Sequence, residues 1–348
     1  MQVKEMLMIG NFNAGSLESF FIEGFRKCGV VVHTYEMVNP FYAALNRHPA
    51  NKLLFKVRPG IFYRDINTDL LEFLHKKYFE VIWVGKGMQL FPQTVEQLKP
   101  HCRVLCNYNA DHPFSFYLSG SGNSNVAQSI PYYDIHFSYS RSIVAQLKSK
   151  YNKEAFCIPF GYDATRKVVR QLPTGEFSGK FLFIAAYDGD RARYLNHLKA
   201  AYLAIYGDPK WNTRNRLRPA VRQAYQGRSL HKDEYVTALA SASGILNLLR
   251  QQNILEGSHN MRTFEVPGYG GLLISQRTAE QSDYFEEGRE AVFFDSPEEL
   301  REKMDFMRKN PSEVEKMKQA AAARSVKDNY SYDERSRQML HCLQLYLH

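Results

Sequence analysis

The sequence predicts two doubly wound α/β domains in tandem, each built on a parallel sheet. The chain has 348 residues, which is more than one domain ordinarily holds. Short apolar or β-branched runs alternate with helical patterns in both halves, and strand–helix alternation implies crossover connections between parallel strands. The alternation is interrupted by a polar, basic stretch at 164–179, where we expect the linker.

When strands and helices are counted together, fewer elements are expected in the first half of the chain than in the second. We expect strands at 5–9, 30–35, 81–84, 104–108, 135–137 and 156–158, and helices near 16–27, 94–99 and 141–151. These elements predict an N-terminal domain over residues 1–165.

The second half repeats the pattern after the linker. Strands are expected at 181–186, 203–206, 244–248, 272–275 and 291–294, with helices near 191–202, 233–240, 261–266, 297–308 and 311–329. This alternation predicts a second domain over residues 166–330. In the remaining segment, 331–348, apolar residues at helical spacing predict an amphipathic helix.

Composition excludes several classes of protein. The 44% hydrophobic content excludes a disordered chain, and no window approaches the roughly 18 uninterrupted apolar residues of a membrane span. The N-terminal residues lack the pattern of a secretory signal, so we expect a cytoplasmic protein. Five cysteines without Cys-x-x-Cys spacing argue against structural zinc or a disulfide framework and favour reduced thiols.

A small-residue loop, Gly10 to Ser16, follows the first predicted strand and opens the first helix. Gly10 and Gly15 would let a phosphate approach the free N–H groups of a helix N-terminus. The lysine of a P-loop and the Gly-x-Gly-x-x-Gly pattern are both absent, which argues against ATP or GTP hydrolysis and against a dinucleotide cofactor. The alternative is an ordinary strand–helix turn.

Two charged motifs follow strands of the first half. Lys86 lies between two glycines after the strand at 81–84, where an ammonium could meet an anionic group, or where the chain could simply turn. Asp111 and His112 follow the strand at 104–108 and precede Pro113, which prevents a helix there. The pair could accept or stabilise a proton, and its alternative is an Asx-type turn with a surface histidine.

In the second half, Asp188-Gly-Asp190 comes between a strand and a helix, directly before Arg191. The motif resembles the Asp-x-Asp that holds a divalent metal in one class of sugar-nucleotide enzymes. A tight turn at a helix N-terminus is the more economical interpretation, so no metal is expected.

The stretch 210–232 is strongly basic and contains no acidic residue. Such a patch could face ligand phosphates, an anionic polymer or a membrane surface, and it is the candidate for peripheral membrane contact. A solvated basic face is the alternative.

The most informative segment runs from Glu256 to Gly271. It predicts a short helix between a polar capping stretch, which includes His259 and Asn260, and two glycines. Arg262 could pair with a diphosphate through its planar guanidinium, and Glu265, one turn later, could accept two ribose hydroxyls. The alternative is a structural Arg–Glu pair on the helix.

These motifs resemble the GT-B glycosyltransferases, in particular the CgeB-like (spore-maturation-protein-like) branch with its glycosyl-transferase group 1 C-terminal domain. The resemblance covers about 180–340 and lies in 183–195, 205–211, 260–265 with Gly270-Gly271, and 295–300. In the first half it lies in 84–87, 111–113 and 158–163. Glu256 and Glu265 are one residue further apart than the two glutamates of retaining members, so the stereochemical course stays open.

The resemblance implies two facing Rossmann-like domains, with 331–348 folding back on the N-terminal one. It implies a metal-independent glycosyltransferase that moves a sugar from a nucleotide-sugar donor to an acceptor hydroxyl, in glycan or cell-surface polysaccharide synthesis. The acceptor would be a glycan, a lipid-linked molecule or a protein, and no cofactor is implied. The candidate catalytic residues are Asp111 and His112, and the candidate donor-binding residues are Glu265, Arg262, Asn260, His259, Lys86, Arg191, Gly10 and Gly15.

Two interpretations of other classes stay open. The net charge of +9 is compatible with a basic nucleic-acid-binding protein, but the sequence contains no nucleic-acid-binding motif, so no nucleic acid is expected as a partner. A catalytically silent GT-B scaffold could also bind a nucleotide or a glycan without transferring it.

Overall fold

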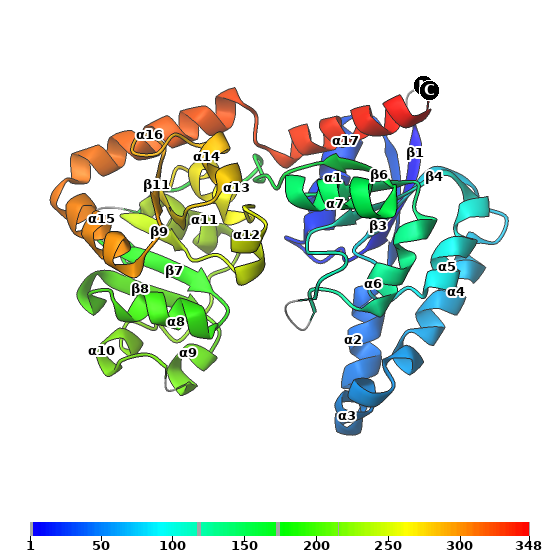
Figure 1. Cartoon of the computed structure of the whole chain (residues 1–348), viewed down its shortest axis with the longest axis horizontal. Coiled ribbons are helices and arrows are strands. Elements are labelled where there is room, and N and C mark those ends of the chain that lie inside the picture. Colours follow the sequence, from blue (N-terminus) through cyan, green and yellow to red (C-terminus); the bar gives the residue numbers. More distant parts are fainter. Residues whose placement is uncertain (1–2, 117–119, 172–174, 215, 348) are drawn as a thin grey trace. The chain divides into compact units, whose positions relative to one another are not determined.

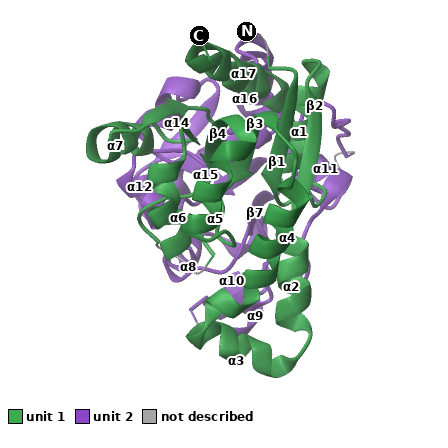
Figure 2. Cartoon of the chain, turned by 90° about the vertical axis from the view of Figure 1, so that its right-hand side faces the viewer, with its two compact units in different colours: residues 1–159, 332–348 green, residues 160–331 purple. Residues whose placement is uncertain are grey.

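The computed structural model describes residues 3–116, 120–171, 175–214 and 216–347. The chain forms two compact units, one of residues 1–159 with 332–348 and the other of residues 160–331 (Figure 2). The chain passes between them after Pro159, six residues before the border expected at residue 165. Part of the expected linker, 172–174, lies outside the described residues.

Within its described residues, unit 1 contains a six-stranded parallel sheet in the order β2-β1-β3-β4-β5-β6 (Figure 1). Its strands are β1 (Glu5–Gly10), β2 (Val31–Glu36), β3 (Phe79–Gly85), β4 (Cys102–Asn109), β5 (Ile135–Ser138) and β6 (Glu154–Cys157). Its helices are α1 (Leu17–Lys27), α2 (Val38–Asn46), α3 (Pro49–Val57), α4 (Arg64–Leu74), α5 (Pro92–Gln97), α6 (Ser124–Ser129), α7 (Arg141–Tyr151) and α17 (Tyr332–Leu347).

Alternating side chains of the central strands cover the two faces of this sheet. Leu7 and Ile82 pack with α4 and α5 in one apolar cluster. Trp83, a neighbour of Ile82 in the strand, points to the other face, where its indole N–H lies 3.2 Å from the sulfur of Met339 in α17. Gly24 of α1 would place a Cβ 2.1 Å from the hydroxyl of Ser336, so the glycine lets α17 lie against α1.

Unit 2, over its described residues, contains a sheet in the order β11-β10-β9-β7-β8. This is the order β5-β4-β3-β1-β2 of unit 1, read from the opposite edge and without a counterpart of β6. The strands are β7 (Phe181–Ala185), β8 (Leu203–Gly207), β9 (Gly244–Asn247), β10 (Leu273–Gln276) and β11 (Ala291–Phe294). The helices are α8 (Gly189–Asn196), α9 (Lys210–Thr213), α10 (Pro219–Arg222), α11 (Lys232–Ser241), α12 (Gln251–Leu255), α13 (Arg262–Gly268), α14 (Ala279–Tyr284), α15 (Pro297–Lys309) and α16 (Pro311–Lys327).

The predicted fold class is confirmed in each unit: both are Rossmann-like, with parallel strands and covering helices. The helix expected over 191–202 is wrong in its second half, because α8 ends at Asn196 and a separate 3₁₀ turn covers Ala200–Tyr202. None of the helices in the described part of the chain is long and apolar enough to cross a membrane.

Candidate functional site

A group of three arginines in unit 2 lies where its strands end. Arg191 follows β7 in the first turn of α8, Arg250 follows β9, and Arg262 begins α13. Burial, together with the positive charges of Arg262 and Arg250, lowers the pKa of Arg191 to about 10, whereas Asp188 acts in the opposite direction. Arg250 and Arg262 are therefore both near enough to repel Arg191, an arrangement that an anion would relieve.

Two of these guanidinium groups are held in place by strand-end carbonyls. Arg191 is 9% exposed, and its Nε donates to the carbonyl of Leu248 at 2.9 Å. Arg262 donates through Nη2 to the carbonyl of Ile184, while its Nε is buried without a hydrogen-bond partner among the described residues. Because carbonyl bonds neutralise no charge, the cluster keeps its cationic character and one unused donor.

The carboxylate of Glu265 lies one turn along α13 from Arg262. Its Oε2 accepts a 2.8 Å hydrogen bond from the hydroxyl of Tyr235 in α11. Burial raises the pKa of Glu265, while Arg262 and the Tyr235 hydroxyl act in the opposite direction. Arg262 and Glu265 thus make their hydrogen bonds to other groups. The alternative interpretation, a structural Arg–Glu pair on the helix, therefore does not describe what fixes these two side chains.

The polar residues before α13 have a supporting role. Asn260 and Asn247 are joined by reciprocal side-chain bonds of 2.8 and 3.1 Å. His259 is fully buried, with Nδ1 at 2.6 Å from Glu280 and Nε2 accepting from the backbone N–H of Phe160. Both ring nitrogens are therefore engaged inside the protein. This corrects the expectation that His259 contacts a donor, because the imidazole has no face toward solvent.

Asp188 acts as a helix cap. Its Oδ1 accepts from the backbone N–H groups of Asp190 at 2.9 Å and Arg191 at 3.2 Å. This is the turn at a helix N-terminus expected for Asp188-Gly-Asp190.

Tertiary structure changes the character of the basic stretch 210–232, of which Asn215 lies outside the described residues. Arg228 pairs with Glu234 and with Glu176, which comes from a distant part of the sequence. Arg216 lies close to Gly189, at the start of α8. The stretch is therefore not one uniform cationic face.

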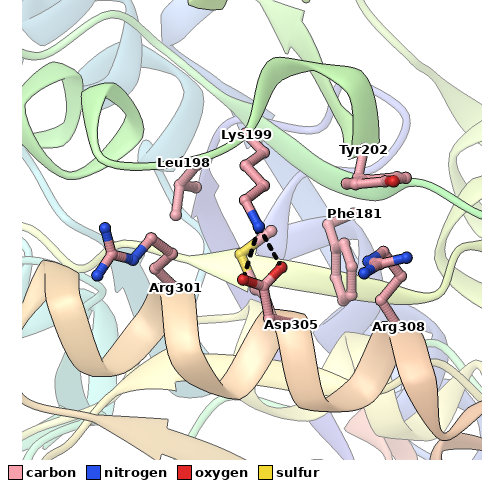
Figure 3. A pocket seen from close by; sticks show the side chains of 8 residues that line it. Phe181, Leu198, Lys199, Tyr202, Arg301, Asp305 and Arg308 are labelled. Carbon is pink, nitrogen blue, oxygen red and sulfur yellow. Dashed lines mark hydrogen bonds and ion pairs between the residues drawn. The ribbon is translucent and has the colours of Figure 1, made fainter.

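At the amino end of the sheet of unit 2, a depression is also lined by basic residues, among them Arg301 and Arg308 (Figure 3). Lys199 bridges both carboxylate oxygens of Asp305 at 3.1 and 2.8 Å across it. About 10 Å³ of free space remains, which holds a water molecule and no more. A nucleotide cannot occupy it.

The loop after β1 in unit 1 is filled by acidic side chains. The N–H of Phe12 donates to Glu36 at 2.8 Å, and a Cβ on Gly10 would come within 3.0 Å of Glu18. Burial raises the pKa of Glu18. Gly15, at φ +85°, serves the turn before Ser16, which caps α1. The two carboxylates would repel a phosphate, which favours the ordinary strand–helix turn over a phosphate site at Gly10 and Gly15.

Lys86 and Asp111 form an ion pair of 2.7 Å at the carboxyl end of the sheet in unit 1, where sequence reasoning had placed each of them separately. Lys86 also donates to the carbonyl of Gly120. His112 is 2% exposed and meets Phe114 edge to face at 4.5 Å, so it is not the surface histidine of the alternative interpretation. Asp111 is the more accessible member of the predicted catalytic pair.

A pocket of about 500 Å³ in unit 1 adjoins this ion pair, since Gly120 belongs to its lining. Phe55, Tyr63 and Phe91 supply aromatic surface, and Lys52 and other residues of α3 lie along it. This pocket could not be predicted from local patterns, because its walls come from separate segments between 45 and 125. Two residues of the site in unit 2, Arg250 and Tyr235, were also missing from the predicted site. Arg250 could have been predicted because it follows a strand, whereas nothing in the sequence around Tyr235 indicates a role in a site.

Residues 191–341 match a protein family described as glycosyl transferase-like. A search of curated proteins finds no match.

The whole chain is similar to several solved structures. Sucrose-phosphate synthase from Thermosynechococcus elongatus aligns over 99% of both chains, with a TM-score of 0.67 and 11% identity. A glycosyltransferase from Rickettsia africae aligns over 100% of this chain and 99% of its own, with a TM-score of 0.66 and 11% identity. Anabaena HepE in complex with UDP aligns over 98% and 99%, with a TM-score of 0.62 and 9% identity. At these identities the likeness establishes the fold.

Proposed function

We propose that the protein is a glycosyltransferase that moves a sugar from a nucleotide-sugar donor to an acceptor hydroxyl. The observation that carries the proposal is the arginine cluster of Arg191, Arg250 and Arg262 at the carboxyl end of the sheet in unit 2. The match of residues 191–341 to a glycosyl transferase-like family supports it, because that segment contains all three arginines. The proposal assigns the donor to unit 2 and the acceptor to unit 1.

The chemistry of the leaving group explains why three arginines are useful. When the bond from the anomeric carbon breaks, the nucleoside diphosphate leaves with the electron pair, and its negative charge grows. Fixed cations stabilise that charge more in the transition state than in the ground state, which lowers the barrier. Arg262 Nε, which has no hydrogen-bond partner among the described residues, would donate to a diphosphate oxygen without giving up an existing bond. No metal is required for this step, and we propose metal-independent transfer.

The ribose of the donor is assigned to Glu265. A carboxylate accepts hydrogen bonds from two neighbouring hydroxyls, and Tyr235 fixes one of its oxygens at 2.8 Å. Asn260 then acts by holding the start of α13 through Asn247. This places the diphosphate contact and the ribose contact one helical turn apart.

On the acceptor side we assign proton transfer to Asp111. Its carboxylate is anchored by Lys86 at 2.7 Å, and its backbone N–H donates to Asn109 Oδ1 at 2.9 Å. Asp111 would accept the proton of the acceptor hydroxyl as that oxygen forms its bond to the anomeric carbon. His112, buried against Phe114, would support the loop. Lys86, paired with Asp111, is then a positioning residue of the acceptor side and not a donor contact.

Calorimetry with UDP, GDP and TDP tests the proposal, together with a transfer assay on a panel of nucleotide sugars. For Arg262→Gln we expect roughly 10- to 100-fold weaker binding of the preferred nucleotide, since a hydrogen bond to a charged group contributes about 1.5–3 kcal/mol. Arg308→Gln is the matched control, because it removes one arginine from the opposite edge of the same sheet. Equal losses in both variants, or no nucleotide binding by the wild type, would contradict the assignment.

A further inference from the structure

One segment of unit 1 is basic and contains no acidic residue at all. Residues 37–64 lie between Glu36 and Asp65, and their cations are Arg47, Lys52, Lys56, Arg58 and Arg64. All five side chains are exposed, and none forms an ion pair within the described part of the chain. We call this segment, which includes α2 and α3, the basic arm.

The basic arm also exposes large apolar side chains. Leu53 is 69% exposed and Val57 73%, and Tyr42, Leu54 and Ile61 are 53, 41 and 45% exposed. No residue of α3 is buried. In Figures 1 and 2, α2 and α3 extend away from the sheet of unit 1. Isolated exposed apolar residues are ordinary, but five within twenty positions form a patch.

The helical geometry of α3 sorts these residues into neighbouring stripes. Leu53 and Val57 are four positions apart and share one face, and Lys52 and Lys56 share the adjacent face. A helix with apolar and cationic stripes side by side suits a lipid interface, where the apolar stripe enters the acyl boundary and the cations meet headgroup phosphates.

We propose that the basic arm docks on the surface of an anionic lipid bilayer, with Leu53 and Val57 in the interface. Charge complementarity selects this partner. A second copy of the chain would bring the same five cations against these, which is repulsive. A nucleic acid would account for the cations but would leave Leu53 and Val57, the most exposed apolar side chains of the basic arm, in water.

The docking site replaces the stretch 210–232 as our candidate for membrane contact. Arg228 of that stretch is neutralised by Glu176 and Glu234. None of the large apolar side chains exposed in the described residues falls between 210 and 232. Cations without an apolar stripe bind a lipid surface by electrostatic attraction alone, which is weaker and is screened by salt.

The arm also borders the pocket of unit 1, since Lys52, Phe55 and Lys56 belong to the pocket lining. A docked arm therefore brings the pocket to the lipid surface. A further consequence rests on the proposed function. If the protein is a glycosyltransferase, its acceptor is a lipid-borne molecule with an anionic headgroup.

Co-sedimentation of the full chain with vesicles tests docking without any donor or acceptor. The vesicles contain phosphatidylcholine alone or phosphatidylcholine with phosphatidylglycerol. We expect binding to the anionic vesicles only. Leu53→Ser with Val57→Ser, and separately the triple change of Arg47, Arg58 and Arg64 to Gln, should each weaken it by about tenfold or more.

Two matched controls lie in unit 2. Leu255→Ser with Val326→Ser removes helical apolar residues of similar exposure, 63 and 71%, and Lys210, Arg214 and Arg216 changed to Gln remove three cations. Both controls should bind like the wild type, with circular dichroism confirming that every variant folds. No binding by the wild type, equal losses in the controls, or a dimer that dissociates in Leu53→Ser with Val57→Ser would overturn the proposal. Nucleotide affinity, measured separately, reports on the proposed function alone.

Discussion

The two units share one strand order but carry opposite charge at equivalent places. After the first strand of unit 1, Glu18 and Glu36 occupy the loop. After the first strand of unit 2, Asp188 is engaged as the cap of α8, and Arg191 and Arg262 are bonded to strand-end carbonyls. The comparison teaches that a Rossmann-like fold provides a place for a ligand, while a few side chains decide whether an anion can use it.

The units also differ in how the chain completes them. Unit 1 needs α17, from the far end of the sequence, to cover α1 and Trp83. Unit 2 is assembled from one continuous stretch, 160–331. Three experiments test these two differences between the units, namely the charge at the loop after the first strand and the need for α17.

The largest effect is expected from removing α17 by truncation after Ser331. The helix buries Tyr332, Met339, Leu340, Leu343 and Leu347. At about 1.5–3 kcal/mol for each side chain, the loss is comparable to the whole stability of a domain, about 5–15 kcal/mol. Unit 1 should therefore lose its cooperative melting transition while unit 2 keeps its own, as measured by calorimetry.

Two point variants calibrate this truncation. Met339→Ala should cost about 2–5 kcal/mol, because it leaves a cavity beside Trp83. Leu345→Ser, at a 59% exposed position of the same helix, should change little. An unchanged melting profile for the truncated chain would show that α17 is not part of the core of unit 1.

A smaller effect is expected for Glu265→Gln, which should weaken nucleotide binding about tenfold, because an amide oxygen is a weaker acceptor than a carboxylate. The difference in affinity between UDP and 2′-deoxy-UDP should shrink by the same factor if the ribose is the contact. Calorimetry measures both. Equal affinities of wild type and variant would contradict the assignment.

The matched control is Glu18→Gln in unit 1, because burial raises the pKa of both glutamates. A raised pKa in the folded state means that stability falls as pH rises from the ordinary range of glutamate through the folded value. Both glutamine variants should therefore lose this part of the pH dependence. Only Glu265→Gln should alter nucleotide affinity.

The smallest effect is expected from chelation. Asp188 is engaged as the cap of α8 and the arginines supply the positive charge, so transfer should persist in excess EDTA. Asp188→Asn should also keep the transfer activity of the wild type, since asparagine caps helices as aspartate does. Loss of transfer in EDTA that magnesium or manganese restores would identify Asp188 and Asp190 as metal ligands.

Much of the fold was predictable because its signals are local. Each strand of both sheets was expected within a few residues, since buried parallel strands appear as continuous apolar runs. The helices between Val38 and Leu74 were not expected. No residue of α3 is fully buried, so its core-facing pattern is weak. The buried face of α4, with Ile66, Leu70 and Leu74 at helical spacing, was a local signal that was missed. The end of α8 was misplaced for the related reason that helix ends depend on tertiary contacts.

The sequence by itself determined that two parallel sheets form, and that Lys86, Asp111 and Arg191 follow strand ends, because position along a strand follows from local pattern. Only the tertiary structure decided how these charges are used. It paired Lys86 with Asp111, gathered Arg250 to the other arginines, and closed the loop of Gly10 with carboxylates. Hydrogen bonds and charge repulsion act through space over a few ångströms, and residues that are distant along the chain meet at that range only after folding.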